Sequence, residues 1–501
     1  MTNMNQKRQR VASPVSSPRI ECRASDPSSK EPSDLSAVDA ELFSINDSLQ
    51  KEETSQKQTW QIGKRVKKLV ESHEDLPTAK KLDAYFLWGT ALARLASLNE
   101  DSTLAEAAAD KFQLMLELSE DSGDEDAADA ALGAVGFSLW GSSLLIVATE
   151  TQNRHVLDEA LNKFQRAVKV DGGTTFETRF QYAKALKEGG DLVTFLEKDK
   201  KEEGNAYYQR GLKECGKLES IYMEVSAKQA KQSRDEECDY EDDDTVLCED
   251  FAEVKLLEAV LQGLLEDSSS IDDFHRTFAL YREAISLNSS STDALMEMTN
   301  YLAARCLVSS MQGVKPTASE WATLFQNLEI EYKTLLMRCG FNLEDFYKIC
   351  KRKEDLHDRK ESVGQEIDER VPYLLNTLGK GLATFVQAFP RLQEQTNKQK
   401  KKRKKSADAR FTRAVELLRS AHHFHDKLGS YYLACLYASP AFEDENQCRT
   451  WLETADSYGA LEDEFDVQMF TTMKEKSWFK RLIQPPEQVD EGDDNVGQHD
   501  E

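Results

Sequence analysis

The sequence is short of the features that mark secreted proteins and common enzymes. Its nine cysteines form no CxxC pair and are scattered from Cys22 to Cys448, a usage typical of reduced thiols inside the cell. The first residues, MTNMNQKRQR, lead into no apolar run, so no secretory signal is expected. The HExxH, GxSxG and GxGxxG motifs are also absent. We therefore expect a non-enzymatic protein without a cofactor, and an enzyme with an unrecognised site is the weaker alternative.

Basic residues are in deficit. The 501 residues include 64 lysines and arginines against 90 aspartates and glutamates, which gives a formal net charge of −26. Such a surface repels nucleic acids and acidic membranes as a whole, so a contact with either would need a local basic patch. Two acidic stretches, residues 119–126 and 235–250, could instead attract a basic client protein.

Potential metal ligands gather at one place only. His422, His423, His425 and Asp426 follow one another closely, but no distant further ligand can be paired with them. On a helix, His422 and Asp426 would share a face. We interpret the group as exposed imidazoles at a helix end and expect no metal site.

A glycine-rich segment resembles a phosphate-binding loop but fails its requirements. Residues 211–218 read GLKECGKL, in which Lys217 follows Gly216. The loop needs a preceding strand, and a serine or threonine after the lysine to hold magnesium. Here the preceding residues, AYYQR, have a helical pattern and Leu218 stands in place of the hydroxyl, so no nucleotide site is expected.

What the sequence does contain is an internal repeat. Leu87-Trp88-Gly89 recurs as Leu139-Trp140-Gly141, 52 positions later (89 to 141). The same offset relates five further pairs: Tyr85 and Phe137, Leu92 and Leu144, Ala108 and Ala160, Phe112 and Phe164, and Met115 and Ala167. Small residues beside large apolar ones, at three- and four-residue spacing, allow two helices to approach closely and interlock. We expect these residues, both tryptophans included, to form a repeated core and not a binding groove.

The order of these residues resembles the tetratricopeptide repeat, whose helix pair reads W-x2-L-G-x2-Y and then A-x3-F-x2-A. Tyr281 and Ala284 fall in the Phe and Ala places of a later copy. The period departs from the usual ~34 residues, but longer loops can absorb the difference because loop closure entropy grows slowly with length. The resemblance implies an all-α fold, a tetratricopeptide-like α-solenoid of antiparallel helix pairs. The alternative is two unrelated amphipathic helices that share a tripeptide.

Composition shifts divide the chain into helical groups, disordered termini and charged insertions. Segments rich in Ser, Pro and charge cannot bury enough apolar surface to fold alone. The predicted segments are a disordered arm (1–35), N-terminal repeats (36–232), an acidic linker (233–250), central repeats (251–395), a basic loop (396–408), C-terminal helix pairs (409–484) and an acidic disordered tail (485–501).

One apolar segment passes a first test for a membrane span. Residues 130–148 carry no charge over a length that could cross a bilayer. They contain Gly133, Gly136, Gly141 and several serines, and acidic residues flank them where basic residues are expected at one end of a span. They also align with the charged helix of the first repeat. We expect the central buried helix of a solenoid and no membrane contact, with a transmembrane helix as the alternative.

Two basic clusters predict a nuclear protein. The longer one consists of Lys400, Lys401, Lys402, Arg403, Lys404 and Lys405, and the shorter one of Lys7, Arg8 and Arg10. The longer run resembles a nuclear localisation signal that an import receptor would bind, and the alternative is a solvated lysine loop. Ser13-Pro14 and Ser17-Pro18 beside the shorter cluster are candidate phosphorylation sites that would offset its charge. No aromatic residues are interleaved for base stacking, so nucleic acid is not the expected partner.

The helical repeats, basic clusters and acidic insertions together resemble a fungal nuclear helical-repeat family. This family includes the enhancer of translation termination and the negative regulator of a prolyl-hydroxylase-like dioxygenase. The likeness rests on Leu76-Pro77 before AYFLWGTAL at residues 84–92, then on Lys111-Phe112 and Lys163-Phe164. The family's amino-terminal basic motif is missing as such, with only residues 7–10 in its place. The resemblance implies an adaptor that binds a 2-oxoglutarate dioxygenase or the translation-termination machinery.

The function predicted from the sequence is recognition of a partner protein. Stacked helix pairs form a concave surface that can receive a helix or an extended peptide. The second hypothesis is an acidic nuclear chaperone that binds a histone or ribosomal protein through its acidic loops. Salt separates the two, because purely electrostatic client binding weakens as ionic strength rises whereas groove packing persists.

Overall fold

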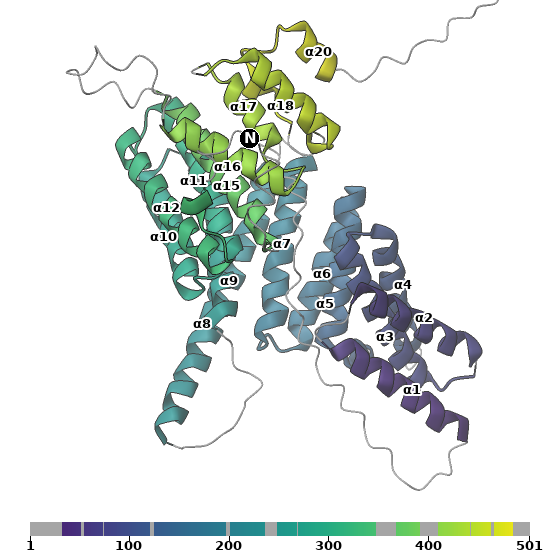
Figure 1. The fold of residues 1–501 in the computed structure, drawn as a ribbon. Helices are drawn as coiled ribbons and strands as arrows, with labels where there is room; N and C mark the ends of the chain where they lie inside the picture. The colour runs from purple at the N-terminus through teal and green to yellow at the C-terminus, as the bar shows by residue number, and fades with distance from the viewer. Residues whose placement is uncertain are drawn as a thin grey trace, which may run out of the picture. The chain divides into compact units, whose positions relative to one another are not determined.

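The computed structural model of this chain is entirely helical in its regular elements. It describes residues 33–51, 55–73, 75–120, 125–196, 201–235, 248–267, 269–346, 367–390, 409–440, 442–461 and 465–483, and no strand occurs among them. In the N-terminal part of the chain each helix packs against the next, and further along several consecutive helices do the same (Figure 1). The expected all-α, repeat-like architecture is therefore confirmed at this level.

Several predicted segments lie outside the described residues. These are both basic clusters, at residues 7–10 and 400–405, the tail after 484, and most of the acidic linker and of the disordered arm. The described ends of the linker are helical, since α8 (Lys201–Asp235) reaches its start and α9 (Cys248–Leu265) begins before its end. The arm likewise ends in a helix, because α1 begins at Ser33.

The chain divides into two compact units, and the division falls between Glu266 and Asp267 and not at the acidic linker. The N-terminal unit runs to Glu266 and also includes residues 282–287, and the C-terminal unit comprises 267–281 and the residues from 288 onward. Helix α9 belongs to the N-terminal unit because its apolar face, with Phe251 and Leu261, packs against Tyr208 and Leu218 of α8.

The N-terminal unit is a series of helices in which each contacts the next. Its helices are α1 (Ser33–Gln50), α2 (Gln56–Ser72), α3 (Thr78–Asn99), α4 (Ser102–Glu120), α5 (Glu125–Thr151), α6 (Arg154–Val170), α7 (Phe176–Leu196), α8 and α9. In addition, α3, α5, α7 and α9 contact one another in that order. This second set of contacts joins alternate helices and is the arrangement expected where successive helix pairs stack.

The two copies of the repeat use glycine in the same way. A Cβ at Gly89 would lie 2.9 Å from the ring of Phe112, and a Cβ at Gly141 would lie 2.8 Å from the ring of Phe164. Real Cβ atoms do not approach a neighbour so closely, so only glycine lets α3 meet α4 and α5 meet α6 at these points. The two phenylalanines are fully buried.

The aromatic residues of the two copies also correspond. Tyr85 stacks on Trp88 with ring centroids 6.5 Å apart, and Phe137 stacks on Trp140 at 6.4 Å. Burial differs between the copies, since Trp140 is 2% exposed whereas Trp88 is only partly buried. Conversely, Leu92 is buried and its counterpart Leu144 only partly so.

The turns within the two copies match as well. Glu100 and Gln152, 52 positions apart, both adopt left-handed backbone conformations, with φ of 51° and 53°. The next residue closes each turn, because Asp101 N donates to Ala96 O at 3.1 Å and Asn153 N donates to Ala148 O at 3.0 Å. The repeat therefore extends from the helix contacts into the connection between them.

Helix α5 contains the one described segment that is long and apolar enough to cross a membrane, Asp129–Thr151, with a mean hydropathy of 1.8. Gly133, with φ of 62°, interrupts its helical geometry. Phe137 and Trp140 pack in a core with α3 and α4, and Ala148 packs in a core with α6 and α7.

The C-terminal unit is built around one helix. Its elements are most of α10 (Ile271–Leu287), then α11 (Thr292–Gln312), α12 (Ala318–Arg338), α15 (Arg370–Ala388), α16 (Ala409–Phe424), α17 (Ser430–Ala438), α18 (Glu445–Ser457), η1 (Val467–Phe470) and α20 (Ser477–Ile483). Helix α15 contacts α11, α12, α16 and α17 and is buried on most of its surface, as a central helix requires. Tyr281 and Ala284 are both buried in α10.

Candidate functional site: a basic cleft beside α8

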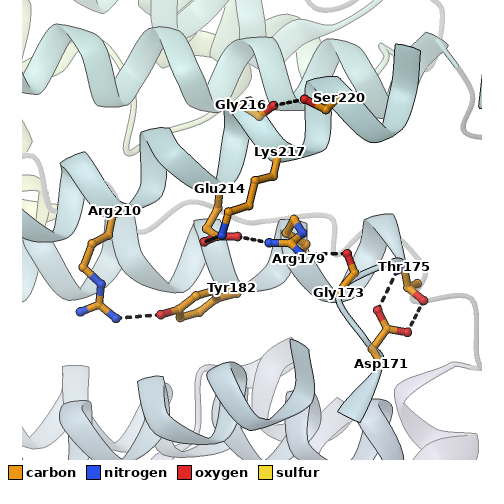
Figure 2. A network of polar contacts seen from close by, with 10 residues as sticks. All are labelled: Asp171, Gly173, Thr175, Arg179, Tyr182, Arg210, Glu214, Gly216, Lys217 and Ser220. Carbon is orange, nitrogen blue, oxygen red and sulfur yellow. Dashed lines mark hydrogen bonds and ion pairs between the residues drawn. The ribbon is translucent and has the colours of Figure 1, made fainter. Parts of the chain in front are cut away.

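A tight connection between α6 and α7 forms one end of the site. Gly172 and Gly173 follow Asp171 with φ of 68° and 71°, a left-handed conformation that glycine adopts without strain. Thr175 N donates to the Asp171 carboxylate at 2.7 Å, and the Thr175 hydroxyl donates to the same carboxylate (Figure 2). The loop is thus held by its own hydrogen bonds just before α7 begins.

Arg179, in the first turn of α7, is fixed from two sides. Its Nη1 donates to Oε2 of Glu214 on α8 at 2.5 Å, and its Nη2 donates to the carbonyl of Gly173 at 2.8 Å. The side chains of Arg179 and Glu214 are each 11% exposed. Charge-assisted hydrogen bonds of this kind are stronger and more directional than neutral ones. The guanidinium is therefore held in one orientation against the loop.

Glu214 is shared between two cations. Its second oxygen, Oε1, accepts a hydrogen bond from Nζ of Lys217 at 2.7 Å, one turn further along α8. The Lys217 side chain is 55% exposed, so its ammonium remains open to solvent on one side. Figure 2 shows Lys217, Glu214 and Arg179 converging from α8 and α7.

Arg210 lies one turn before Glu214 and points to a different partner. Its Nη2 donates to the hydroxyl of Tyr182 at 2.7 Å, and its guanidinium carbon lies 5.6 Å from the centre of the Tyr207 ring. Arg210, Glu214 and Lys217 are spaced four and three residues apart, so all three lie on one face of α8. In Figure 2 the Arg210 side chain lies well away from the Lys217 ammonium.

Between these elements lies a cleft of about 480 Å³, which we call the basic cleft. Its walls come from α6, the α6–α7 loop, α7 and α8, and are formed by Gln165, Val168, Lys169, Gly172, Gly173, Arg179, Tyr182, Arg210, Glu214 and Lys217. Four of these side chains are cationic and one is anionic, in a chain whose net charge is −26. The cleft is therefore a local patch of net positive charge on an acidic protein.

The lining of the basic cleft includes no serine, cysteine or histidine. The nearest thiol in sequence, Cys215, is buried, and burial raises its pKa to about 12. A protonated, buried thiol is unreactive.

The residues selected from the sequence lie elsewhere. Trp88, Gly89, Leu92, Phe112, Trp140, Gly141, Leu144 and Phe164 lie in the packed interior of helix pairs and do not line the cleft. Of the cleft residues, Arg210, Glu214 and Lys217 lay in or directly before the rejected phosphate-loop segment, and that segment lies within α8. Two features of the sequence could have indicated the cleft. Arg210 and Lys217 lie on one face of α8, and Gly172-Gly173 follow the end of α6.

The histidine group differs from its expected exposure. His422 packs edge-on against the rings of Trp451 and Tyr458, and His425 lies with its ring 5.5 Å from that of Tyr373. The imidazoles are consequently half-buried and not exposed, because α16 is covered by α18 and α15 at this end. In the described part of the chain, no three potential ligands are grouped so as to hold a metal ion.

Comparison with known proteins gives no assignment. The sequence matches no family model and no curated protein at a significant level. The fold and the site define a helical-repeat protein with a cationic cleft.

Proposed function

We propose that this protein is a non-enzymatic adaptor that binds a partner protein at the helical surface around the basic cleft. The observation that carries the proposal is that four cations from three successive helices line one cleft of an acidic chain. A helical-repeat surface is suited to peptide recognition. A cationic cleft on it would attract an acidic partner in spite of the net negative charge of the chain.

We further propose that the N-terminal unit is tetratricopeptide-like, with antiparallel pairs α3/α4 and α5/α6. The one-turn connections at Glu100 and Gln152 and the matched contacts of Gly89 and Gly141 support this pairing. In this arrangement α5 is a central helix of the stack and needs no membrane.

The same proposal places the adaptor in the nucleus. Its support is the sequence of the two basic clusters, which an import receptor would bind. The resemblance to the nuclear helical-repeat family points to a 2-oxoglutarate dioxygenase or a translation-termination component as the partner.

The test is affinity purification of the tagged full chain from nuclei, with quantitative mass spectrometry. The cleft variant is Arg210→Glu/Lys217→Glu, and the matched control is Lys228→Glu, which changes an exposed lysine on the same helix, paired with Glu224. We expect specific proteins that wild type and control retain and the cleft variant loses. Identical sets for all three proteins, or none, would contradict binding at this surface.

The acidic-chaperone hypothesis has its own support in the net charge of −26. A basic client would bind the acidic surface and would not need the cationic cleft. The chaperone would be favoured over the adaptor if the cleft variant still bound histones or ribosomal proteins and lost them when the ionic strength was raised.

A further inference from the structure

We infer that the ligand of the basic cleft is an extended acidic segment of the partner, one that presents two or more carboxylates. The inference rests on the proposed adaptor function and adds the chemistry of what is recognised.

The charge balance of the cleft calls for more than one negative group. Lys169, Arg179, Arg210 and Lys217 are balanced by a single carboxylate, that of Glu214, so the lining carries a net charge of +3 (four minus one). A ligand with a single negative charge would remove water from these cations but leave most of their charge uncompensated, which would cost binding free energy. The rest of the acidic surface repels the same ligand, so binding is confined to the cleft.

The spacing of the cations distinguishes a chain of carboxylates from one compact anion. Arg210 and Lys217 are seven residues apart on α8, which places their backbones roughly 10 Å apart along the helix. Their side chains do not converge, since Arg210 turns toward Tyr182 and Lys217 toward Glu214 (Figure 2). An extended peptide advances by about 3.3 Å per residue, so carboxylates two to four residues apart match this separation.

The two arginines of the cleft are already held in place before any ligand arrives. Arg210 is oriented by Tyr182 and Tyr207, and Arg179 by Glu214 and the Gly173 carbonyl. Preorganised side chains lose little conformational entropy on binding, which favours affinity. Lys169 supplies a fourth cation from the end of α6, on the other side of the Gly-Gly loop.

The experiment is fluorescence anisotropy with the purified full chain. The probe is a labelled peptide of alternating Glu and Ser, and its counterparts carry Gln in place of Glu, or a single phosphoserine and no Glu. We expect the Glu peptide to bind wild type and Lys228→Gln equally, and to bind Arg210→Gln/Lys217→Gln about tenfold or more weakly, a change of about 1.4 kcal/mol. Lys169→Gln, which alters the opposite wall, should weaken binding as well.

Three results would overturn the inference: equal binding of the Gln peptide, unchanged binding by both cleft variants, or tighter binding of the phosphoserine peptide than of the Glu peptide. Circular dichroism of each variant shows whether it is folded. If the double variant is unfolded, the comparison is made with Lys169→Gln alone. Failure here, together with cleft-dependent capture of a nuclear partner, would reject acidic recognition and leave the adaptor function in place. Loss of both would reject the adaptor function too.

Discussion

The ammonium of Lys163 lies 3.6 Å from the centre of the Trp140 ring, across the contact between α6 and α5. In the preceding copy of the repeat, Lys111 lies 4.8 Å from the centre of the Trp88 ring. A cation over an indole face is attracted by the ring quadrupole, more strongly when the pair is shielded from water. The second helix of each pair therefore holds the tryptophan of the first by the same device.

The two tryptophans should contribute unequally to stability. Trp140→Ala removes a side chain that is 2% exposed, so a loss of about 3–5 kcal/mol is expected. Trp88→Ala should cost less, because Trp88 is only partly buried. Urea unfolding followed by circular dichroism measures both. Equal losses, or a larger one for Trp88, would show that burial does not decide the difference.

Glycine at position 141 should be required, although alanine is the better helix former. Gly141→Ala places a Cβ 2.8 Å from the Phe164 ring, and we expect it to lower stability by about 1–2 kcal/mol. The matched control is Gly216→Ala in α8, where the added Cβ meets nothing within 4 Å. That change should raise stability by about 0.5–1 kcal/mol. Thermal unfolding of the two variants checks the sign, and a stabilised Gly141→Ala would refute the close contact.

The left-handed residue of the α5–α6 turn should be improved by glycine. Gln152 has φ of 53°, where a side chain costs about 1 kcal/mol, so Gln152→Gly should stabilise the protein. As a control, Gln113→Gly alters an exposed position inside α4 and should destabilise by about 1 kcal/mol. We expect the unfolding midpoint to rise for Gln152→Gly and to fall for Gln113→Gly. A destabilised Gln152→Gly would argue against the turn.

The ion pair between Arg179 and Glu214 in the wall of the basic cleft should contribute far more to stability than an exposed pair on the same helix. Glu214→Ala leaves Arg179 buried without its carboxylate, and we expect a loss of about 3 kcal/mol. Glu224→Ala breaks the pair with Lys228, whose side chains are 68% and 69% exposed, and should change stability by about 0–1 kcal/mol. Urea unfolding of both variants compares the two losses in free energy of unfolding. Equal losses would show that the Arg179–Glu214 pair is not buried.

In the C-terminal unit, Glu329 should make stability depend on pH. Burial raises its pKa, and Arg413, 2.8 Å away, offsets this only in part. A carboxyl with a raised folded-state pKa stabilises fully below its unfolded-state pKa, and that contribution is lost as pH rises through the folded-state pKa. Glu329→Gln cannot ionise, so it should gain stability relative to wild type between acidic and neutral pH.

Urea unfolding midpoints of wild type and Glu329→Gln, measured at acidic and at neutral pH, give this difference in stability. The control is Glu453→Gln, because Glu453 forms an exposed pair with Arg449. The control should show no such trend. If wild type instead gains on Glu329→Gln as pH rises, the pair with Arg413 outweighs burial.

The repeated core was predictable because it is local. The contact of a glycine with a phenylalanine joins residues within one helix pair, and the 52-residue offset repeats this contact in the next pair. Gly89 and Gly141 make the close approach that the sequence predicts. The equivalent turns at Glu100 and Gln152 were not foreseen, since neither residue type favours a positive φ.

The basic cleft was not predictable in the same way. Lys169, Arg179 and Lys217 come from three helices, and no motif joins them, so only the packing of α6, α7 and α8 brings them together. The central place of α15 and the cover over His422 likewise depend on contacts between distant segments. Periodicity reports which face of a helix is buried but not which helix covers it.

Site-specific photo-crosslinking in living cells tests the central claim most directly. Gln165 is exposed, uncharged and part of the cleft wall, so a photoreactive residue there leaves all four cations in place, and Lys228 serves as the matched position outside the cleft. We predict a partner cross-linked from position 165 and not from position 228, lost in the Arg210→Glu/Lys217→Glu background. The same partner from both positions, or from position 228 alone, would contradict recognition in the cleft.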